Sequence, residues 1–105
     1  MPLETFPFDV AEFLDSPEAQ REFLADAIES GDANYIAKAL GHVARARGMT
    51  SIAKEAGVTR EALYKALSDK GDPKLSTLMG VLRALGVTLT PKASEDNFAE
   101  RRLGA

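Results

Sequence analysis

One stretch of this 105-residue chain, residues 49–68, limits the folds open to it more than any other. Two short helices that cross at a tight turn need a small residue where they approach each other and a flexible residue at the turn. Ala53 supplies the small side chain, and Gly57 can adopt a positive φ without strain. Four further positions carry apolar residues that point inward in such an arrangement: Ile52, Val58, Leu63 and Ala66. The stretch therefore predicts two helices joined by a tight turn.

The side chains between these apolar positions are expected to stay exposed, and all of them can form hydrogen bonds. They are Thr59, Arg60, Glu61, Tyr64 and Lys65. The small residue, the glycine and the apolar offsets are weak signals singly, but together they are typical of a DNA-binding helix-turn-helix. The alternative is an ordinary helical hairpin whose charged side chains are solvated.

Charge is divided unevenly along the chain, and the net charge of −3 conceals this. Residues 1–34 hold nine acidic residues and one basic residue, whereas residues 35–92 hold ten basic and four acidic residues. This segregation suggests different partners for the two segments, and the basic segment suits nucleic acid although the whole chain is acidic. The chain has no cysteine, which excludes disulfides, thiolate zinc sites and iron–sulfur clusters.

Apolar residues elsewhere also recur mostly at helical spacing, so an all-α fold is predicted. Ser16, Asp32 and Thr59 are expected N-caps, because their side-chain oxygens can accept hydrogen bonds from amides in the first turn of a helix. One short strand is the exception, since Val87–Thr90 alternates between apolar and polar residues. The expected helices are a short one capped by Asp9, then 17–30, 33–47, one from 49 or 50 to 56, 60–67, and one from 75 or 76 to 85.

Residues 33–90 resemble a Cro/CI-type domain of the XRE, λ-repressor-like superfamily, in which five helices surround a helix-turn-helix. Three phrases carry a closer resemblance: FDVAEFL, GDANYIAKALGHVARARGMTSIAKEAGVTREALYKALS and GDPKLSTLMGVLRALGVTL. Over about residues 6–92 the chain is similar to the addiction module antidote proteins, a HigA-like group of antitoxins. The resemblance implies a cytoplasmic bacterial antitoxin that neutralises a RelE/ParE (HigB-like) toxin and represses its own operon as a dimer.

This resemblance also divides the chain into three parts. Residues 1–31 are expected to form an acidic N-terminal helical extension, residues 32–91 the Cro/CI-type helix-turn-helix domain, and residues 92–105 a flexible tail.

Carried over to this sequence, the helix-turn-helix pattern makes Thr59–Lys65 the recognition segment. Arg60 is the first candidate for reading a base, because its guanidinium group matches O6 and N7 of guanine. Thr59 and Glu61 could contact a thymine methyl group and a cytosine amine, although Glu61 could instead orient Arg60 or stabilise the helix N-terminus. Tyr64 and Lys65 lie one turn later in the recognition segment, where contacts with phosphates and with the wall of the groove are usual. Candidates for phosphate contacts are Thr50, Ser51, Lys54, Lys70 and Lys74, and the lysines among them could equally be solvated.

Two arginines close to the end of the helix at 33–47 have two interpretations. Arg45 and Arg47 could interact favourably with the C-terminus of that helix, or they could face DNA. The residues alone do not choose between these roles.

Contacts with protein partners are assigned to the acidic N-terminal segment and to the C-terminal part of the chain. Toxins of the implied superfamily are basic, so an acidic segment with aromatic residues is a complementary surface. The candidate toxin contacts are Phe6, Phe8, Phe13, Glu18, Glu22 and Asp26. Alternatively, the phenylalanines complete the core and the acidic side chains are solvated. The expected dimer contacts are Met79, Arg83, Val87 and Leu89.

Enzyme activity is not expected, and neither is a cofactor. His42 is the only histidine, and it has no thiol or suitably spaced carboxylate with which to form a catalytic triad or a metal site. Two other functions stay open: a stand-alone repressor of phage or plasmid type, and a protein-sequestering module without affinity for DNA.

Overall fold

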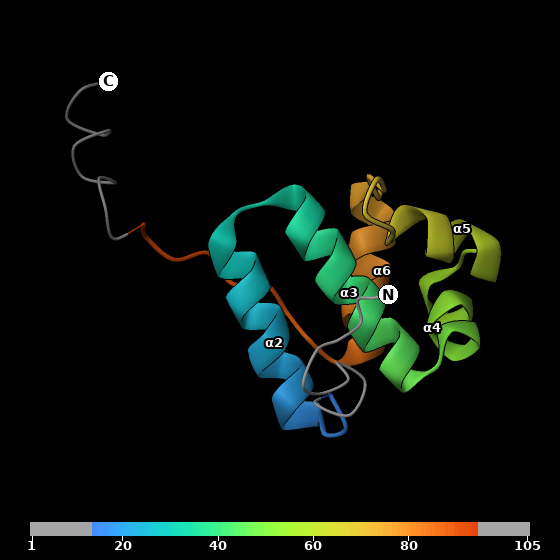
Figure 1. Cartoon of the computed structure of the whole chain (residues 1–105), viewed down its shortest axis with the longest axis horizontal. Coiled ribbons are helices and arrows are strands. Elements are labelled where there is room, and N and C mark those ends of the chain that lie inside the picture. Colours follow the sequence, from blue (N-terminus) through green and yellow to red (C-terminus); the bar gives the residue numbers. More distant parts are fainter. Residues whose placement is uncertain (1–13, 95–105) are drawn as a thin grey trace, which may run out of the picture.

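The computed structural model describes residues 14–94, which form helices joined by short connections (Figure 1). The described part of the chain contains no strand, so its fold is all-α, as predicted. No helix within it is long and apolar enough to cross a membrane. The five helices are α2 (Pro17–Ser30), α3 (Ala33–Arg47), α4 (Met49–Ala56), α5 (Arg60–Ala66) and α6 (Leu75–Leu85).

Three of these helices begin at the side-chain caps that the sequence predicts. Ser16 Oγ accepts a hydrogen bond from the Ala19 amide at 3.1 Å, with proline in the first helical position. Asp32 accepts from the amides of Asn34 and Tyr35 at 3.0 and 3.2 Å. Thr59 Oγ1 begins α5 in the same way, and removing a cap of this kind costs about 1 kcal/mol.

All five helices contribute to one hydrophobic core. Its largest fully buried side chains are Leu14, Leu24, Leu40, Val43, Leu63, Leu67, Val81 and Leu82. In Figure 1, α2 lies along one side of α3, while α4 and α5 lie on its other side, next to α6. Because Leu24 and Ala27 are part of the same core as α6, helix α2 cannot be removed without opening that core.

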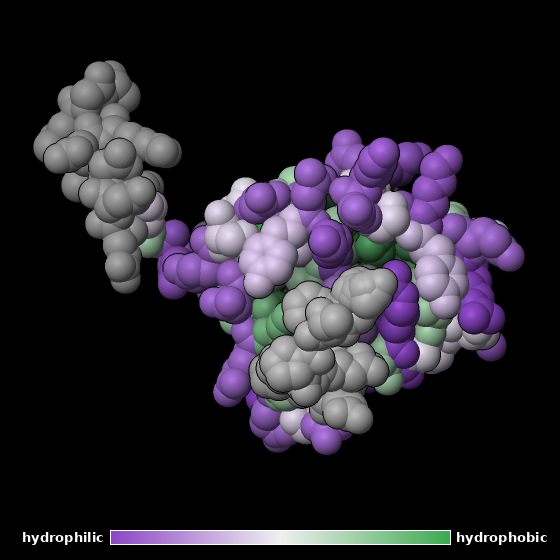
Figure 2. Space-filling model, in the orientation of Figure 1, coloured by the Kyte–Doolittle hydropathy of each residue, from purple (hydrophilic) through white to green (hydrophobic). Residues whose placement is uncertain are grey.

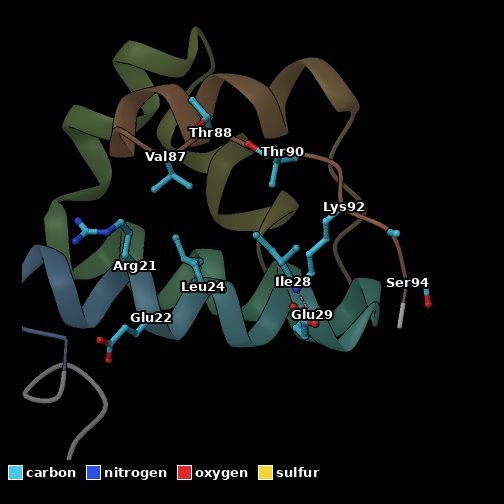
Figure 3. Close-up of a pocket in the computed structure, with 13 residues that line it drawn as sticks. Arg21, Glu22, Leu24, Ile28, Glu29, Val87, Thr88, Thr90, Lys92 and Ser94 are labelled. Atoms are coloured by element: carbon cyan, nitrogen blue, oxygen red, sulfur yellow. Dashed lines mark ion pairs between the residues drawn. The ribbon is translucent and has the colours of Figure 1, made fainter. Parts of the chain in front are cut away.

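The strand predicted at Val87–Thr90 is wrong, because these residues form no strand in the structure. Alternation of apolar and polar residues makes a strand only where another extended segment offers hydrogen-bonding partners. Here the neighbour is α2, a helix whose backbone groups are already paired (Figure 3). The Val87 amide instead donates to the Leu82 carbonyl at 2.9 Å and closes the C-terminus of α6.

Two smaller expectations have different outcomes. The helix expected from Asp9 lies outside the described residues except for Leu14, which forms a turn and is buried. Helix α5 ends at Ala66, one residue before the predicted end, and Leu67 is its C-cap.

Candidate functional site

The connection between α4 and α5 is a tight turn centred on Gly57. This glycine has φ 77°, a left-handed conformation that residues with a Cβ adopt only with strain. The amides of Gly57 and Val58 donate to the carbonyls of Lys54 and Ala53 at 3.2 and 3.0 Å, so the end of α4 is closed by the turn itself. Ala53 is buried, with 3% of its surface exposed. The roles predicted for Ala53 and Gly57 agree with this geometry.

Helix α5 is held by one fully buried side chain and by a close approach to α3. Leu63 has no exposed surface, and Leu67, which follows the helix, is 2% exposed. A Cβ added to Gly41, in the middle of α3, would lie only 2.7 Å from the Leu67 carbonyl oxygen. The absence of a side chain at Gly41 therefore lets the end of α5 pack directly against α3.

The outward face of α5 is polar, and the surface over α4 and α5 is mostly hydrophilic (Figure 2). All five residues of the predicted recognition segment are exposed there: Thr59, Arg60, Glu61, Tyr64 and Lys65. Thr59 has a structural role as well, since its hydroxyl oxygen accepts a hydrogen bond from the Ala62 amide at 3.0 Å. A side chain that caps the helix is less available to contact a base.

Two arginines stack on one tyrosine beside this face. The guanidinium carbons of Arg45 and Arg60 lie 5.7 and 5.6 Å from the centre of the Tyr64 ring, within the range of a cation–π contact. The Tyr64 side chain raises the pKa of Arg60, chiefly by a hydrogen bond and then by electrostatic interaction. Like any arginine, Arg60 is a cation at physiological pH, and here it lies next to an aromatic ring.

The first turn of α4 lacks a side-chain cap. Gly48 is the N-cap of α4 and has no side chain that could accept from the amides in this turn. Thr50 and Ser51, both exposed, lie in this turn, and Lys54 is exposed near the other end of α4. The other two candidates for phosphate contacts, Lys70 and Lys74, are exposed in the connection between α5 and α6. All five candidates are accessible to solvent.

Arg47 has a role that neither interpretation of the sequence included. Its Nε donates to Gln20 Oε1 at 2.7 Å, and one of its terminal nitrogens donates to the Leu85 carbonyl at 3.0 Å. Arg47 thus joins α3 to α2 and α6. No local signal indicates this, because the partners lie 27 and 38 residues away in the chain.

A shallow groove of about 850 Å³ runs between α2 and residues 87–94 (Figure 3). Leu24 and Ile28 of α2 face Val87 across it, and Glu22 and Glu29 stand on the α2 side. Glu29 forms an ion pair with Lys92 at 3.3 Å. No local sequence pattern indicates this groove, since its two walls come from segments about 60 residues apart.

The candidate residues for protein contacts lie in three places. Glu18, Glu22 and Asp26 are exposed along α2, whereas Phe6, Phe8 and Phe13 lie outside the described residues. Met79 and Arg83 are exposed on α6, and Leu89 is exposed beyond it, while Val87 packs against the core. Leu75, one turn before Met79, is 72% exposed and was not predicted as a contact.

Sequence comparison assigns the chain to a family. A sequence model described as probable addiction module antidote protein matches residues 4–93. The chain belongs to this family. A relative from Haemophilus influenzae, described as an uncharacterized protein, is 46% identical over 80 residues, which are 76% of this chain and 82% of the relative. No solved structure matches the chain.

Membership of this family confirms that the chain belongs to the addiction module antidote proteins, as its resemblance to such proteins in three sequence phrases predicted. An antidote counteracts a toxin, so membership implies a toxin partner in general. The HigA-like subgroup, the RelE/ParE class of the toxin and the binding of DNA stay predictions.

Proposed function

We propose that this antidote binds operator DNA with α4 and α5, acting as a helix-turn-helix of the λ-repressor-like type, and so represses its own operon. The observation that carries the proposal is the division of α5 into two faces. Leu63 anchors one face in the core, and Arg60 and Lys65 stand exposed on the other. Seven residues of helix are about 10 Å long, which fits the major groove of B-DNA.

The uncapped start of α4 supports the same proposal. Amides in the first turn of a helix bind phosphate when no side chain has already satisfied them, and the helix dipole favours the negative charge. The amides of Thr50 and Ser51 belong to such a turn. Phosphate contacts there would orient the domain, while Arg60 would read bases.

The test of DNA binding is a titration of a labelled duplex from the region upstream of the gene, repeated at several salt concentrations. Wild type should bind tightly at low salt and more weakly as salt rises. Arg60→Ala should weaken binding by about 1–3 kcal/mol if Arg60 contacts a guanine. Arg21→Ala removes the same charge from α2 and is the control, with a smaller effect expected.

A wild-type protein that fails to bind this duplex even at low salt would contradict the proposal. The function would then be that of a sequestering module, which binds its partner without affinity for DNA.

We infer further that α2 supplies the contact with a RelE/ParE-type toxin. Glu18, Glu22 and Asp26 are spaced four residues apart, so they form one acidic row on the exposed side of α2. Glu22, the middle residue of this row, lines the groove, which exposes apolar side chains of α2 and of residues 87–94 and also contains Arg21 and Lys92. An acidic edge next to an apolar floor suits a basic partner that also has apolar contact residues.

The toxin contact is tested with the triple variant Glu18→Gln, Glu22→Gln and Asp26→Asn, titrated with the toxin encoded beside the antidote gene. Surface substitution is preferable to deletion, because α2 supplies core residues. Binding should weaken tenfold or more. Neutralising three exposed acidic residues elsewhere, Glu55, Asp69 and Asp72, is the matched control and should leave toxin affinity nearly unchanged. Equal losses in both variants would point to net charge rather than to this surface.

A further inference from the structure

The cluster of Arg45, Tyr64 and Arg60 joins two helices. Arg60 and Tyr64 are one turn apart on α5, which puts their side chains next to each other on the same face. Arg45 comes from α3, and its guanidinium group reaches the same ring. Its side chain turns back along α3, with Nη1 3.5 Å from the place where a Cβ on Gly41 would stand. The ring therefore connects a residue of the predicted helix-turn-helix to one outside it.

Within residues 14–94, the charge of Glu61 acts on Arg60 without forming an ion pair with it. Neither Arg45 nor Arg60 forms an ion pair there, although both are exposed. Both guanidinium groups lie within cation–π range of the same ring, which restrains the two side chains while leaving them exposed to solvent. Two exposed cations at one place on the surface suit a polyanion such as DNA.

We propose that Tyr64 is a positioning residue that holds Arg45 and Arg60 as one pair for the DNA duplex. In this arrangement Arg60 reads a base, Arg45 contacts the sugar–phosphate backbone at the edge of the groove, and Tyr64 acts through them. The proposal rests on the DNA binding proposed above, and it adds a contact from α3 to the interface. Ordering two long side chains before binding lowers the entropy lost when the complex forms.

The aromatic ring, rather than the hydroxyl group, is the feature to test. In Tyr64→Phe the ring that contacts both arginines stays and only the hydrogen bond between the hydroxyl group and Arg60 is lost, so affinity for the upstream duplex should remain within about threefold of wild type. In Tyr64→Leu the ring is lost while an apolar side chain remains, and affinity should fall about tenfold. Tyr35→Leu is the matched control, because Tyr35 is 40% exposed and Tyr64 is 37% exposed. That control should bind as wild type does.

Arg45 is tested in the same titration. Arg45→Gln should weaken binding about three- to tenfold and lower the salt slope by about one, as expected for one lost phosphate contact. The double variant with Tyr64→Leu should bind little worse than Tyr64→Leu alone, since the ring and the arginine act together. Losses that simply multiply would overturn the proposal, and so would wild-type affinity in Tyr64→Leu.

A measurement without DNA tests whether the cluster of Arg45, Tyr64 and Arg60 forms, independently of whether it binds DNA. Ring current from Tyr64 should shift the side-chain NMR signals of Arg45 and Arg60 in wild type and Tyr64→Phe, and the shift should vanish in Tyr64→Leu. Unshifted signals in wild type would overturn the proposal whatever the titration shows. If the signals are shifted but wild type binds no duplex, the proposed function fails and the DNA role of the cluster fails with it. Circular dichroism melting confirms that each variant is folded.

Discussion

Arg47 Nε donates a hydrogen bond to Gln20 Oε1 at 2.7 Å, and this contact joins α3 to α2. Gln20 is 7% exposed, and its own amide group donates to the Leu14 carbonyl at 3.0 Å. The same arginine donates to the Leu85 carbonyl at the end of α6. One side chain thus satisfies acceptors on two other helices, α2 and α6.

Replacing Arg47 by alanine should lower the free energy of unfolding by about 1–3 kcal/mol, because the acceptors of Gln20 and Leu85 lose their donor. Arg47→Lys should recover only part of this loss, since an ammonium group lacks the planar fork that reaches both acceptors. Urea denaturation measures both variants. Arg21→Ala, an exposed arginine on α2, is the control and should change stability by less than about 0.5 kcal/mol. An Arg47→Ala protein as stable as this control would show that the hydrogen bonds of Arg47 to Gln20 and Leu85 do not stabilise the fold.

Gly41→Ala should destabilise the protein by about 1–3 kcal/mol although alanine favours helices. The new Cβ would lie 2.7 Å from the Leu67 carbonyl oxygen, which is backbone and cannot rotate away. The end of α5 would have to move, so DNA affinity should fall as well. Thermal unfolding and the duplex titration check the two effects. A variant more stable than wild type would contradict this prediction, because it would mean that α3 and the end of α5 can move apart without loss of folding free energy.

The stability of the protein should decrease as the pH falls below about 6.5, and His42 should account for part of the decrease. Burial lowers the pKa of His42, and the positive charges of Arg45 and Lys38 lower it further. The unfolded chain therefore takes up the proton first, which favours unfolding as the pH falls from the ordinary histidine value toward the pKa of the folded state. The rings of His42 and Phe23 also lie in a T-shaped arrangement, with 6.2 Å between ring centres.

Urea midpoints for wild type and His42→Gln, compared between roughly pH 7.5 and 5.5, test this expectation. The variant should lose less stability than wild type over this interval. Because His42 is the only histidine, no other histidine masks the difference. An identical pH dependence in both proteins would show that His42 does not carry the effect.

The dimer that the family resemblance implies should separate into monomers when Met79→Glu and Leu75→Glu are combined, and operator binding should weaken at least tenfold. Leu75 and Met79 are 72% and 42% exposed and lie one turn apart on α6, so they present adjacent apolar surface to solvent. Sedimentation at micromolar concentration measures the oligomeric state. A dimer that survives both substitutions would move the interface elsewhere, with Leu89 as the next candidate.

Most of the described helix boundaries follow from local chemistry and could be predicted. Ser16, Asp32 and Thr59 cap helices through hydrogen bonds to amides two or three residues away, so their roles depend on nearby residues alone. The turn at Gly57 is equally local. The exposure of Arg60 and Lys65 follows from the helical spacing around Leu63.

Contacts between distant segments could not be predicted from these patterns. The bonds of Arg47, the approach of Gly41 to Leu67 and the arginine pair on Tyr64 each join residues of different helices. At Val87–Thr90 the local pattern predicted a strand that does not form, because a strand requires a neighbouring extended segment and the fold places none beside these residues. A hydrogen bond between residues a few positions apart depends on the local sequence, so the sequence alone can predict it. Contacts between distant segments form only once the hydrophobic core has set the positions of the helices, so they depend on the tertiary structure.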